Sequence, residues 1–443
     1  MSAHVVVVGG GLAGLTAACD LADAGARVTL LESRARLGGA TFSFQRDGLA
    51  VDNGQHVLLR CCTEYQRLLA RLGTADGVVL QERFRMPVLA PGRPRTALAR
   101  TGGPAPLHLV AGLATYGALP VTDRLRAFAA AAALRLLDPA DPALDERTFG
   151  DWLRGHGQND TTIGALWNLV SVAALNCDAD GASLALAAMV FRTALLDRAD
   201  GADIGIPRWP LEELHVRPAE KYLLTRGAEV RLRSAVRAVE RDGPGFAVRL
   251  SDETVRADAV VVTAPPETAA AVCPPAAGLS ARRLAGLGAS PIVNVHAVFA
   301  APVTDLSFAA AVGSPVQWVF DRTAVAGLDR GQYLAVSLSA ARTWLDRPVA
   351  ELRDVFLPEL GRLLPAAATT PCTRFFVTRE RRATFRQAPG TARLRPPART
   401  SLPGLVLAGA WTATGWPDTM EGAVRSGHHA ADELAAHLGG GAP

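Results

Sequence analysis

The start of the chain follows the hydrophobic pattern of an α/β fold. The four valines at residues 5–8 predict a buried parallel strand, and the apolar run at residues 28–31 predicts a second one. Between these runs, apolar residues recur at the spacing of one helix face: Leu12, Leu15, Ala18 and Ala22. The pattern therefore predicts a strand, a tight turn, a helix and a neighbouring parallel strand.

The tight turn carries the glycine spacing G-x-G-x-x-G. Gly9 permits the turn, Gly11 lets a pyrophosphate approach the backbone, and Gly14 lets the helix pack closely against the strand. The helix begins at Leu12 and Ala13, where free amides and the helix dipole favour a bound anion. We therefore expect an adenine dinucleotide to bind at this turn.

The residues that follow the second strand extend this prediction. Glu32 ends that strand about twenty residues beyond the glycines, where a carboxylate accepts hydrogen bonds from a ribose 2′-hydroxyl and disfavours a 2′-phosphate. The cofactor is then FAD or NAD rather than NADP. Arg34 and Arg36 can neutralise phosphate, and Gly38 with Gly39 allows a second close approach of the backbone. The alternative is that this basic loop contacts only solvent. Its position, shortly after Glu32, favours phosphate binding.

A hairpin and a polar loop come next. Apolar residues at 42–44 and 49–51 flank an Asp-Gly turn, which is a hairpin signal. The polar cluster at residues 52–56 precedes another apolar run, as in a loop held against a site. For His56 the alternative is a histidine satisfied by local hydrogen bonds, which sequence alone favours. Residues 60–72 read as an amphipathic helix.

The middle of the chain contains an unusually apolar segment. Residues 107–119 are nearly all apolar, and a helix follows Pro120, with Thr122 or Asp123 expected as its cap. Segments that are apolar and partly basic suit either a protein core or a membrane interface. We take residues 107–137 as the candidate membrane-facing segment, with core packing as the default interpretation for the helix.

Strands and helices then alternate to the C-terminus. The glycine-rich turn that begins at Gly409 provides a second helix N-terminus able to face a ligand. Residues 86–106 are rich in Pro, Gly and Arg, which indicates a domain boundary. The remaining predicted elements are helices within 152–196, a helix at 218–226, strands at 229–232, 236–240, 246–250, 257–263, 293–299, 317–320 and 333–337, a helix at 349–364, a strand at 405–408 and a helix at 423–438.

These elements predict two interleaved domains, because 443 residues exceed one ordinary core. The first is a Rossmann-like dinucleotide-binding domain built discontinuously from residues 1–80, 215–270 and 400–438. The second is an α+β substrate domain built from residues 81–214 and 271–399. The fold class is therefore α/β with an interleaved α+β part.

Composition and charge exclude several classes of partner. The chain is 49% hydrophobic and 20% charged, as in a folded globular protein, and its net charge is only +4. It has no basic tract interleaved with aromatic residues, so nucleic acid is excluded as a partner. Its six cysteines are scattered without metal-ligand or disulfide spacing, and we expect no metal site. The absence of a leader pattern and of a spanning apolar run predicts a cytoplasmic protein that does not cross the bilayer.

The motifs, taken in order, resemble the flavin-containing amine oxidase and phytoene desaturase superfamily. The shared marks are the glycine turn, Glu32 with RLGG behind it, and the segments GAEV, VVVTAPP and MEGAVRSG. Within the superfamily, VDNGQHVLLRCCTEY and TGWPDTMEGAVRSG resemble the bacterial hydroxysqualene dehydroxylases, also called squalene-associated FAD-dependent desaturases. The resemblance implies a GR2-type FAD-binding domain and FAD as the cofactor.

The resemblance also implies roles for individual residues. The glycine turn would hold the FAD pyrophosphate and Glu32 the adenosine ribose. Arg36 would lie along the phosphates and Val230 would meet the adenine. The chain departs from the superfamily at Ala40, where Arg is usual, and at Ala410, where Asp is usual and contacts the flavin chain. The residues implied to contact FAD, together with the neighbours expected from the two helix N-termini and the basic loop, are Gly9, Gly11, Leu12, Ala13, Gly14, Glu32, Arg34, Arg36, Gly38, Gly39, Gly54, Gln55, His56, Val230, Gly409, Met420 and Glu421.

The implied reaction is the reductive removal of the allylic hydroxyl of hydroxysqualene to give squalene, in hopanoid and triterpene synthesis. His56 and Glu421 are the candidate proton donors, with loop orientation and helix capping as their alternatives. Trp411 and Trp416 would line the substrate pocket or fill space. The substrate is an isoprenoid, so we expect the protein at the inner face of the cytoplasmic membrane. The oligomeric state is left open.

Three other functions remain as alternatives. They are a phytoene-type desaturase, a non-catalytic prenyl-binding protein of the same fold, and an amine oxidase. The amine oxidase is disfavoured because Lys221 is the only lysine available to face a flavin.

Overall fold

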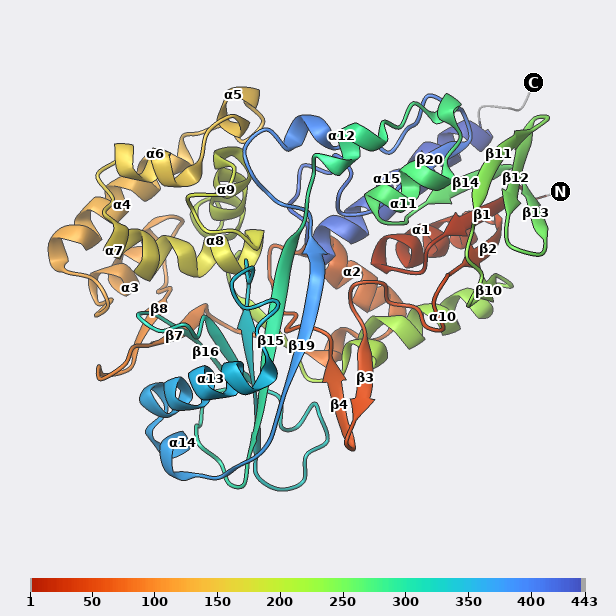
Figure 1. Cartoon of the computed structure of the whole chain (residues 1–443). Coiled ribbons are helices and arrows are strands. Elements are labelled where there is room, and N and C mark those ends of the chain that lie inside the picture. Colours follow the sequence, from red (N-terminus) through yellow and green to blue (C-terminus); the bar gives the residue numbers. More distant parts are fainter. Residues whose placement is uncertain (1, 440–443) are drawn as a thin grey trace.

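A parallel sheet organises one half of the molecule (Figure 1). The computed structural model describes residues 2–439. All neighbouring strands of this sheet pair in parallel, and Val5 to Val8 lie in register with Val28 to Leu31 on one side and with Ala259 to Val262 on the other. In spatial order the strands are β10 (Glu229–Arg231), β2 (Arg27–Leu31), β1 (His4–Val8), β14 (Ala259–Val262) and β20 (Leu405–Leu407).

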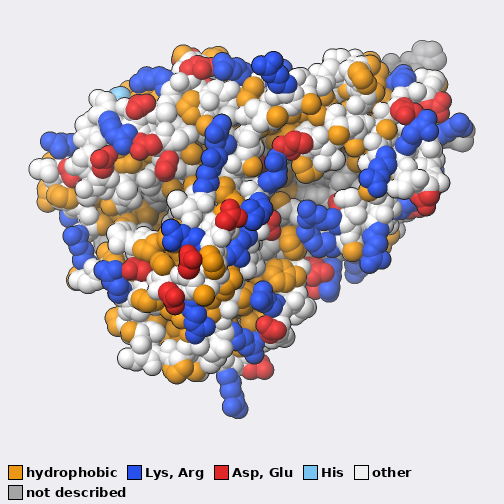
Figure 2. All heavy atoms as spheres, in the orientation of Figure 1, with side chains coloured by type: hydrophobic (Ala, Val, Ile, Leu, Met, Phe, Trp, Pro, Cys, Tyr) orange, Lys and Arg blue, Asp and Glu red, His pale blue; other side chains and the backbone are white. Residues whose placement is uncertain are grey.

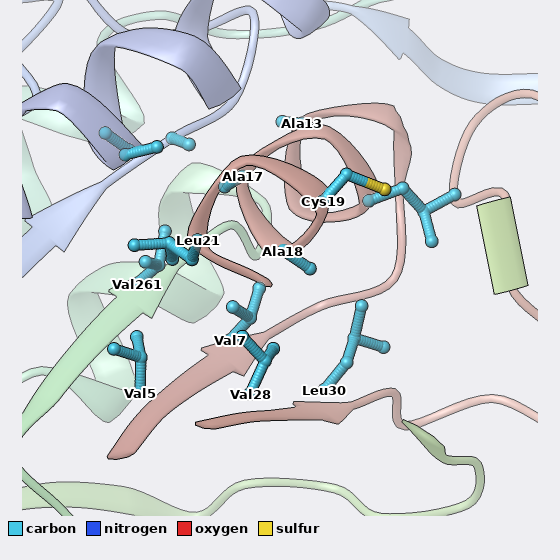
Figure 3. Packing of buried hydrophobic residues seen from close by; sticks show 14 of the residues in the cluster. Val5, Val7, Ala13, Ala17, Ala18, Cys19, Leu21, Val28, Leu30 and Val261 are labelled. Atoms are coloured by element: carbon cyan, nitrogen blue, oxygen red, sulfur yellow. The ribbon is translucent and has the colours of Figure 1, made fainter. Parts of the chain in front are cut away.

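The valines of β1 are buried on both faces of this sheet. Val5 and Val7 pack with α1 (Leu12–Asp23), α10 (Arg217–Leu224) and α15 (Met420–Gly439). Figure 3 shows Val5, Val7, Val28 and Leu30 directed toward the α1 residues Ala17, Ala18 and Leu21. Val6 and Val8 pack on the opposite face. That face is covered by β11 (Ala238–Asp242), β12 (Gly245–Arg249), β13 (Thr254–Ala257), α11 (Pro266–Val272) and α12 (Ala281–Ala285).

A mixed sheet forms the centre of the second half (Figure 1). One of its faces packs against α13 (Val349–Leu363) and α14 (Pro365–Thr369). Residues 85–99 form an antiparallel pair of its strands, so the predicted boundary at residues 86–106 is corrected to a hairpin that has Pro91, Gly92 and Pro94 in its turn. In spatial order the strands are β19 (Cys372–Thr384), β15 (Ser290–Phe299), β18 (Gln332–Leu338), β17 (Trp318–Asp321), β16 (Phe308–Ala311), β7 (Arg85–Leu89) and β8 (Thr96–Ala99).

A helical layer lies beside the mixed sheet and packs around large aromatic side chains, including Phe149, Trp152 and Trp167. The predicted cap of its longest helix is wrong. That helix begins at Val121, directly after Pro120, while Asp123 is buried and accepts a hydrogen bond from Asn159. The helices are α3 (Val110–Ala114), α4 (Val121–Arg135), α5 (Pro142–Asp145), α6 (Phe149–Gly155), α7 (Asp160–Thr162), α8 (Asn168–Leu175) and α9 (Leu184–Phe191).

Smaller elements join the two halves. The predicted hairpin is present, and Asp47 and Gly48 at its turn have positive φ angles of 50° and 79°. The predicted amphipathic helix is present and begins at Thr63. These elements are β3 (Ser43–Arg46), β4 (Leu49–Asp52), β5 (Leu58–Leu59), α2 (Thr63–Leu72), β6 (Val78–Leu80) and β9 (Ile204–Pro207).

The architecture agrees with the predicted α/β class. Every strand of the parallel sheet falls within residues 1–80, 215–270 or 400–438, and every strand of the mixed sheet falls within residues 81–214 or 271–399. We therefore propose these ranges as the bounds of the two domains.

The surface carries both signs of charge, and on the face seen in Figure 2 the Lys and Arg side chains are interspersed with Asp and Glu. Across residues 2–439, no helix is both long enough and apolar enough to span a bilayer.

Candidate functional site

The glycine turn after β1 brings backbone atoms unusually close together. Gly9 has a φ of +110°, and a Cβ on Gly14 would lie 2.0 Å from the Gly9 carbonyl oxygen. Only glycine therefore allows α1 to begin so near the strand. A Cβ on Gly11 would meet only the Gly39 Cα, at 3.7 Å, and no described side chain caps the first turn of α1. Gly11 thus leaves the helix N-terminus open to a ligand.

A second glycine pair folds over the first. The Gly38 amide donates to the Gly10 carbonyl at 2.8 Å, and both Gly38 and Gly39 have positive φ angles. A Cβ on Gly39 would lie 2.8 Å from the Gly11 Cα. The two turns together form a cradle lined by backbone, as the pyrophosphate prediction requires.

Glu32 ties these two turns together. It is buried, one carboxylate oxygen accepts from the Gly10 amide at 2.8 Å, and the other accepts from the Arg34 amide at 2.8 Å and from Ser33 at 3.2 Å. A carboxylate has about four acceptor positions, so one remains for a ribose hydroxyl. Val230 lies nearby on the edge strand β10, paired with Leu30.

The two arginines behind Glu32 have different surroundings. Arg36 stacks on Phe42, with 3.2 Å between guanidinium carbon and ring centroid, and donates to the Leu37 and Gly39 carbonyls. Burial lowers the pKa of Arg36 below its usual range. Arg34 is exposed. Arg36 therefore braces the second glycine turn, and Arg34 is available to solvent or to a phosphate.

Lys221 lies on an open surface. It is an exposed residue of α10 and lines a cleft of about 590 Å³ between that helix and the loop that carries Arg36. This position agrees with the solvated interpretation of Lys221.

The loop after β4 presents polar atoms without partners. The Gln55 Oε1 and His56 Nε2 atoms are buried, and neither has a hydrogen-bond partner within the described chain. A Cβ on Gly54 would lie 3.0 Å from His56 Nε2. Burial lowers the pKa of His56 to about 4, so the imidazole is neutral near pH 7. Buried polar atoms without partners are costly unless a ligand or water satisfies them.

A buried ion pair fixes the start of this loop. Arg322 donates to Asp52 at 2.5 Å, and the other oxygen of Asp52 accepts from Ser43 at 2.6 Å and from the Leu211 amide at 3.1 Å. The next residue, Asn53, bonds to the Phe42 amide and the Ala40 carbonyl. The loop is therefore rigidly positioned while its polar tip remains unsatisfied.

These two features fit a flavin dinucleotide. The glycine cradle and Glu32 suit a pyrophosphate and a ribose, and the loop tip offers an amide oxygen and an imidazole nitrogen to a polar ring. The structure thus provides hydrogen-bonding groups for both ends of FAD.

Glu421 caps a helix. Its carboxylate accepts from the Glu64 amide at 3.1 Å and the Tyr65 amide at 2.8 Å, in the first turn of α2, and it pairs with Arg425 at 2.8 Å. It is 1% exposed, and burial raises its pKa above the usual range. Three donors occupy its oxygens, which favours the capping alternative over a proton donor.

We predict that Glu421→Gln destabilises the protein by about 1–2 kcal/mol, because an amide side chain cannot accept both backbone hydrogen bonds of α2 and loses its ion pair with Arg425. The matched control is Glu433→Gln, which removes the Arg399 ion pair at the surface of the same helix and is expected to cost less than about 0.5 kcal/mol. Urea unfolding measures both. Equal stabilities would contradict the capping role.

The turn before α15 is held by a buried arginine. Arg395 donates to the Thr412 carbonyl, the Ala410 carbonyl and the Thr414 hydroxyl, and burial lowers its pKa to about 10. Gly409 has a φ of +134°, and its amide donates to Ser426 of α15 at 2.8 Å. The backbone here is therefore fixed even though the carboxylate usual at residue 410 is absent.

The two tryptophans and Met420 have packing partners. Trp411 is buried in one hydrophobic cluster with residues of β1, β11, β12 and α11, and it donates to the Ala264 carbonyl at 3.2 Å. The guanidinium of Arg425 lies 4.4 Å from the ring centre of Trp416. Met420 packs against the hydrophobic cluster around α2. For Trp411 the packing favours the space-filling alternative.

Sequence reasoning missed two residues near these elements. Asp418 precedes α15, accepts from the Phe385 amide at 2.8 Å, and has a pKa raised to about 6 by burial. Asn294 on β15 is fully buried and contacts the loop that carries His56. Asp418 was visible as an extra carboxylate in the C-terminal motif, whereas no local signal marked Asn294.

Comparisons with known proteins identify the family. The model of the family described as flavin containing amine oxidoreductase matches residues 12–435. The chain belongs to this family. It is an FAD-dependent oxidoreductase, which confirms the expected cofactor and enzyme class.

Two relatives and one solved structure describe its place in the family. The chain is 33% identical to hydroxysqualene dehydroxylase of Rhodopseudomonas palustris, over 98% of each chain, which places it with the hydroxysqualene dehydroxylases. It is 26% identical to a probable zeta-carotene desaturase of Synechococcus elongatus, over 97% of this chain and 98% of the relative. Cyclohexylamine oxidase from Brevibacterium oxydans has the same fold, with a TM-score of 0.73, 20% identity, and coverage of 99% of this flavoenzyme and 100% of the oxidase.

Proposed function

We propose that this flavoenzyme removes the allylic hydroxyl of hydroxysqualene and releases squalene. The observation that carries the proposal is the full-length similarity to hydroxysqualene dehydroxylases, in a chain that keeps the glycine cradle, Glu32 and the polar loop at residues 54–56. The substrate is thus an isoprenoid alcohol.

The reaction needs one proton and two electrons. The carbon–oxygen bond breaks, the oxygen leaves as water after taking a proton, and a hydride completes the new carbon–hydrogen bond. FAD, when bound in its reduced form, supplies that hydride equivalent. The chain's own residues must position the allylic end of the substrate, donate a proton to the hydroxyl oxygen and exclude water.

Three carboxyl or imidazole groups are candidates for the proton donor. The lowered pKa of His56 leaves it neutral, and Glu421 is held by three donors. Asp418 has a pKa of about 6, and among residues 2–439 no hydrogen bond reaches its side chain other than that from Phe385. A donor works best when its pKa lies near the working pH. Asp418 also lies two residues before the N-terminus of α15, which begins at Met420. From this position and its pKa together we propose Asp418 as the donor and His56 as a residue that orients the hydroxyl, with His56 and Glu421 kept as the competing donors.

The alternative functions have less support. A desaturase of the carotenoid type runs the chemistry in the opposite direction, and the relative that carries such a name is less similar to this chain than the dehydroxylase is. A non-catalytic prenyl-binding role is disfavoured because the chain belongs to a family of flavin-dependent enzymes.

The direction of electron transfer tests these alternatives. Under anaerobic conditions a dehydroxylase in its reduced form is reoxidised by hydroxysqualene, whereas a desaturase in its oxidised form is reduced by phytoene. Flavin absorbance distinguishes the two results.

We also propose that α3 and α4 dock on the membrane that contains the substrate. Six of the ten exposed large hydrophobic side chains in the described chain lie between residues 107 and 136. Along α4 and its C-cap residue Leu136, the side chains of Val121, Leu125, Phe128 and Leu136 repeat at helical spacing on the exposed side. Ala127, Ala130 and Leu134 fill the buried side. An exposed apolar stripe with arginines beside it suits the interface of an anionic bilayer.

The docking surface predicts a specific loss of membrane binding. We expect the double variant Leu125→Glu with Leu136→Glu to bind anionic liposomes about tenfold or more weakly than the wild type, because it puts charges in place of two exposed apolar side chains that would insert into the bilayer. The matched control is Val349→Glu, an exposed apolar residue on α13. Flotation at low salt measures binding. Equal flotation of all three proteins would contradict this surface.

A further inference from the structure

The two faces of β15 have different environments. Val293, Val295 and Ala297 are fully buried in the cluster that packs against α13 and α14. On the opposite face, His296 bonds to Tyr333 at 2.7 Å and to Thr378 at 3.0 Å, so both of its ring nitrogens have partners. Asn294 lies on the same face as His296, because side chains alternate along a strand.

Asn294 is only half satisfied. It is fully buried, and its Nδ2 donates to the Asn53 carbonyl at 3.2 Å. Because a carbonyl can only accept, the contacting end of the amide must be its NH2 group, and the other end must be the oxygen. That oxygen is buried and has no partner within residues 2–439.

Another buried asparagine shows the contrast. Asn176 donates to the Ser290 carbonyl and the Thr384 hydroxyl, and its oxygen accepts from the Ala340 amide at 2.6 Å. All polar groups of Asn176 thus have partners inside the protein. The unsatisfied oxygen of Asn294 is costly in the protein alone, and a hydrogen-bond donor brought by a ligand removes that cost.

The position of Asn294 identifies the site that it serves. Asn53, its partner, directly precedes the loop that carries Gln55 and His56. Five buried side-chain atoms in the described chain have no partner, and three of them belong to Gln55, His56 and Asn294. The structure thus gathers these unsatisfied polar atoms from one loop and from the strand that is bonded to its base.

We propose that Asn294 is a binding residue of this site, whose Oδ1 accepts a hydrogen bond from an O–H or N–H group of the bound ligand. This inference rests on the proposed function, which supplies two such groups: the hydroxyl of the triterpene alcohol and a ring N–H of FAD. Its Nδ2 meanwhile anchors the loop of His56 from the opposite domain.

The test compares Asn294→Leu with Asn176→Leu, two buried amides replaced by an apolar side chain of similar size. The purified proteins are first measured for FAD content, visible spectrum and reduction potential without substrate. The oxidised proteins are then titrated with hydroxysqualene and with squalene, which lacks the hydroxyl. Asn294→Ser serves as a second variant that also shortens the side chain and removes the amide oxygen.

Two results support the proposal and identify the donor. If the substrate hydroxyl is the donor, the Asn294 variants bind hydroxysqualene about three- to tenfold more weakly and squalene unchanged. If the flavin is the donor, their spectrum and reduction potential shift without substrate, and the preference for hydroxysqualene stays the same.

One result overturns the proposal: Asn294 variants that match Asn176→Leu in spectrum, potential and discrimination between the two triterpenes. If the wild type binds FAD but does not bind hydroxysqualene, the proposed function fails, and the spectrum and potential still decide whether Asn294 contacts the flavin.

Discussion

The variant Gly11→Glu is expected to be purified with less than about a tenth of the FAD of the wild type. The new carboxylate would stand at the open N-terminus of α1, where the nearest atom to a Cβ is the Gly39 Cα at 3.7 Å. The side chain thus fits the protein but occupies the cradle with a charge of the same sign as pyrophosphate. Flavin absorbance after denaturation gives the stoichiometry.

The matched control is Gly155→Glu, an exposed position at the end of α6 where a Cβ meets nothing within 4 Å. It should retain full FAD. Circular dichroism shows whether both variants keep their fold. A folded Gly11→Glu protein with one FAD per chain would contradict the assignment of the cradle.

Asp418→Asn is expected to slow the single-turnover oxidation of the reduced enzyme by hydroxysqualene about a hundredfold or more, the usual size of a general acid's contribution. The amide can still accept from the Phe385 amide, so the turn before α15 keeps its geometry. In the wild type the rate should be constant below pH 6 and fall about tenfold per pH unit above it, because only the protonated carboxyl can donate. The variant should lose this pH dependence.

The control is Asp145→Asn, a buried carboxylate that accepts from Ser183 and the Ala392 amide and lies in the helical layer. It should keep the wild-type rate and pH profile. His56→Ala and Glu421→Gln, each checked for retained FAD, complete the comparison. A wild-type rate in Asp418→Asn together with a loss in His56→Ala would assign the proton to His56 instead.

The parts of the site that sequence could predict are those made by neighbouring residues. The turn after β1 needs Gly9 and Gly14 for local steric reasons, so the spacing of these glycines can be recognised in the sequence. The same holds for the Asp47–Gly48 hairpin. Glu32 was predictable because the end of β2 lies beside the glycine turn in any such unit.

The parts that sequence could not predict depend on distant contacts. Asn294 reaches Asn53 across 241 residues, and Glu421 reaches the amide of Tyr65 across 356 residues. The residues next to Glu421 in the sequence give no sign that its carboxylate oxygens accept hydrogen bonds from the first turn of α2. The long strand β19 was also missed, because its charged residues do not alternate with apolar ones.

The most direct test of the proposed function is one anaerobic turnover with product analysis. The purified enzyme is photoreduced, mixed with excess hydroxysqualene, extracted and examined by mass spectrometry. We expect one squalene for each reduced flavin, with the flavin returned to its oxidised spectrum and no squalene from oxidised enzyme. Reduced enzyme that forms no squalene, in a preparation with full FAD, would contradict the proposed function.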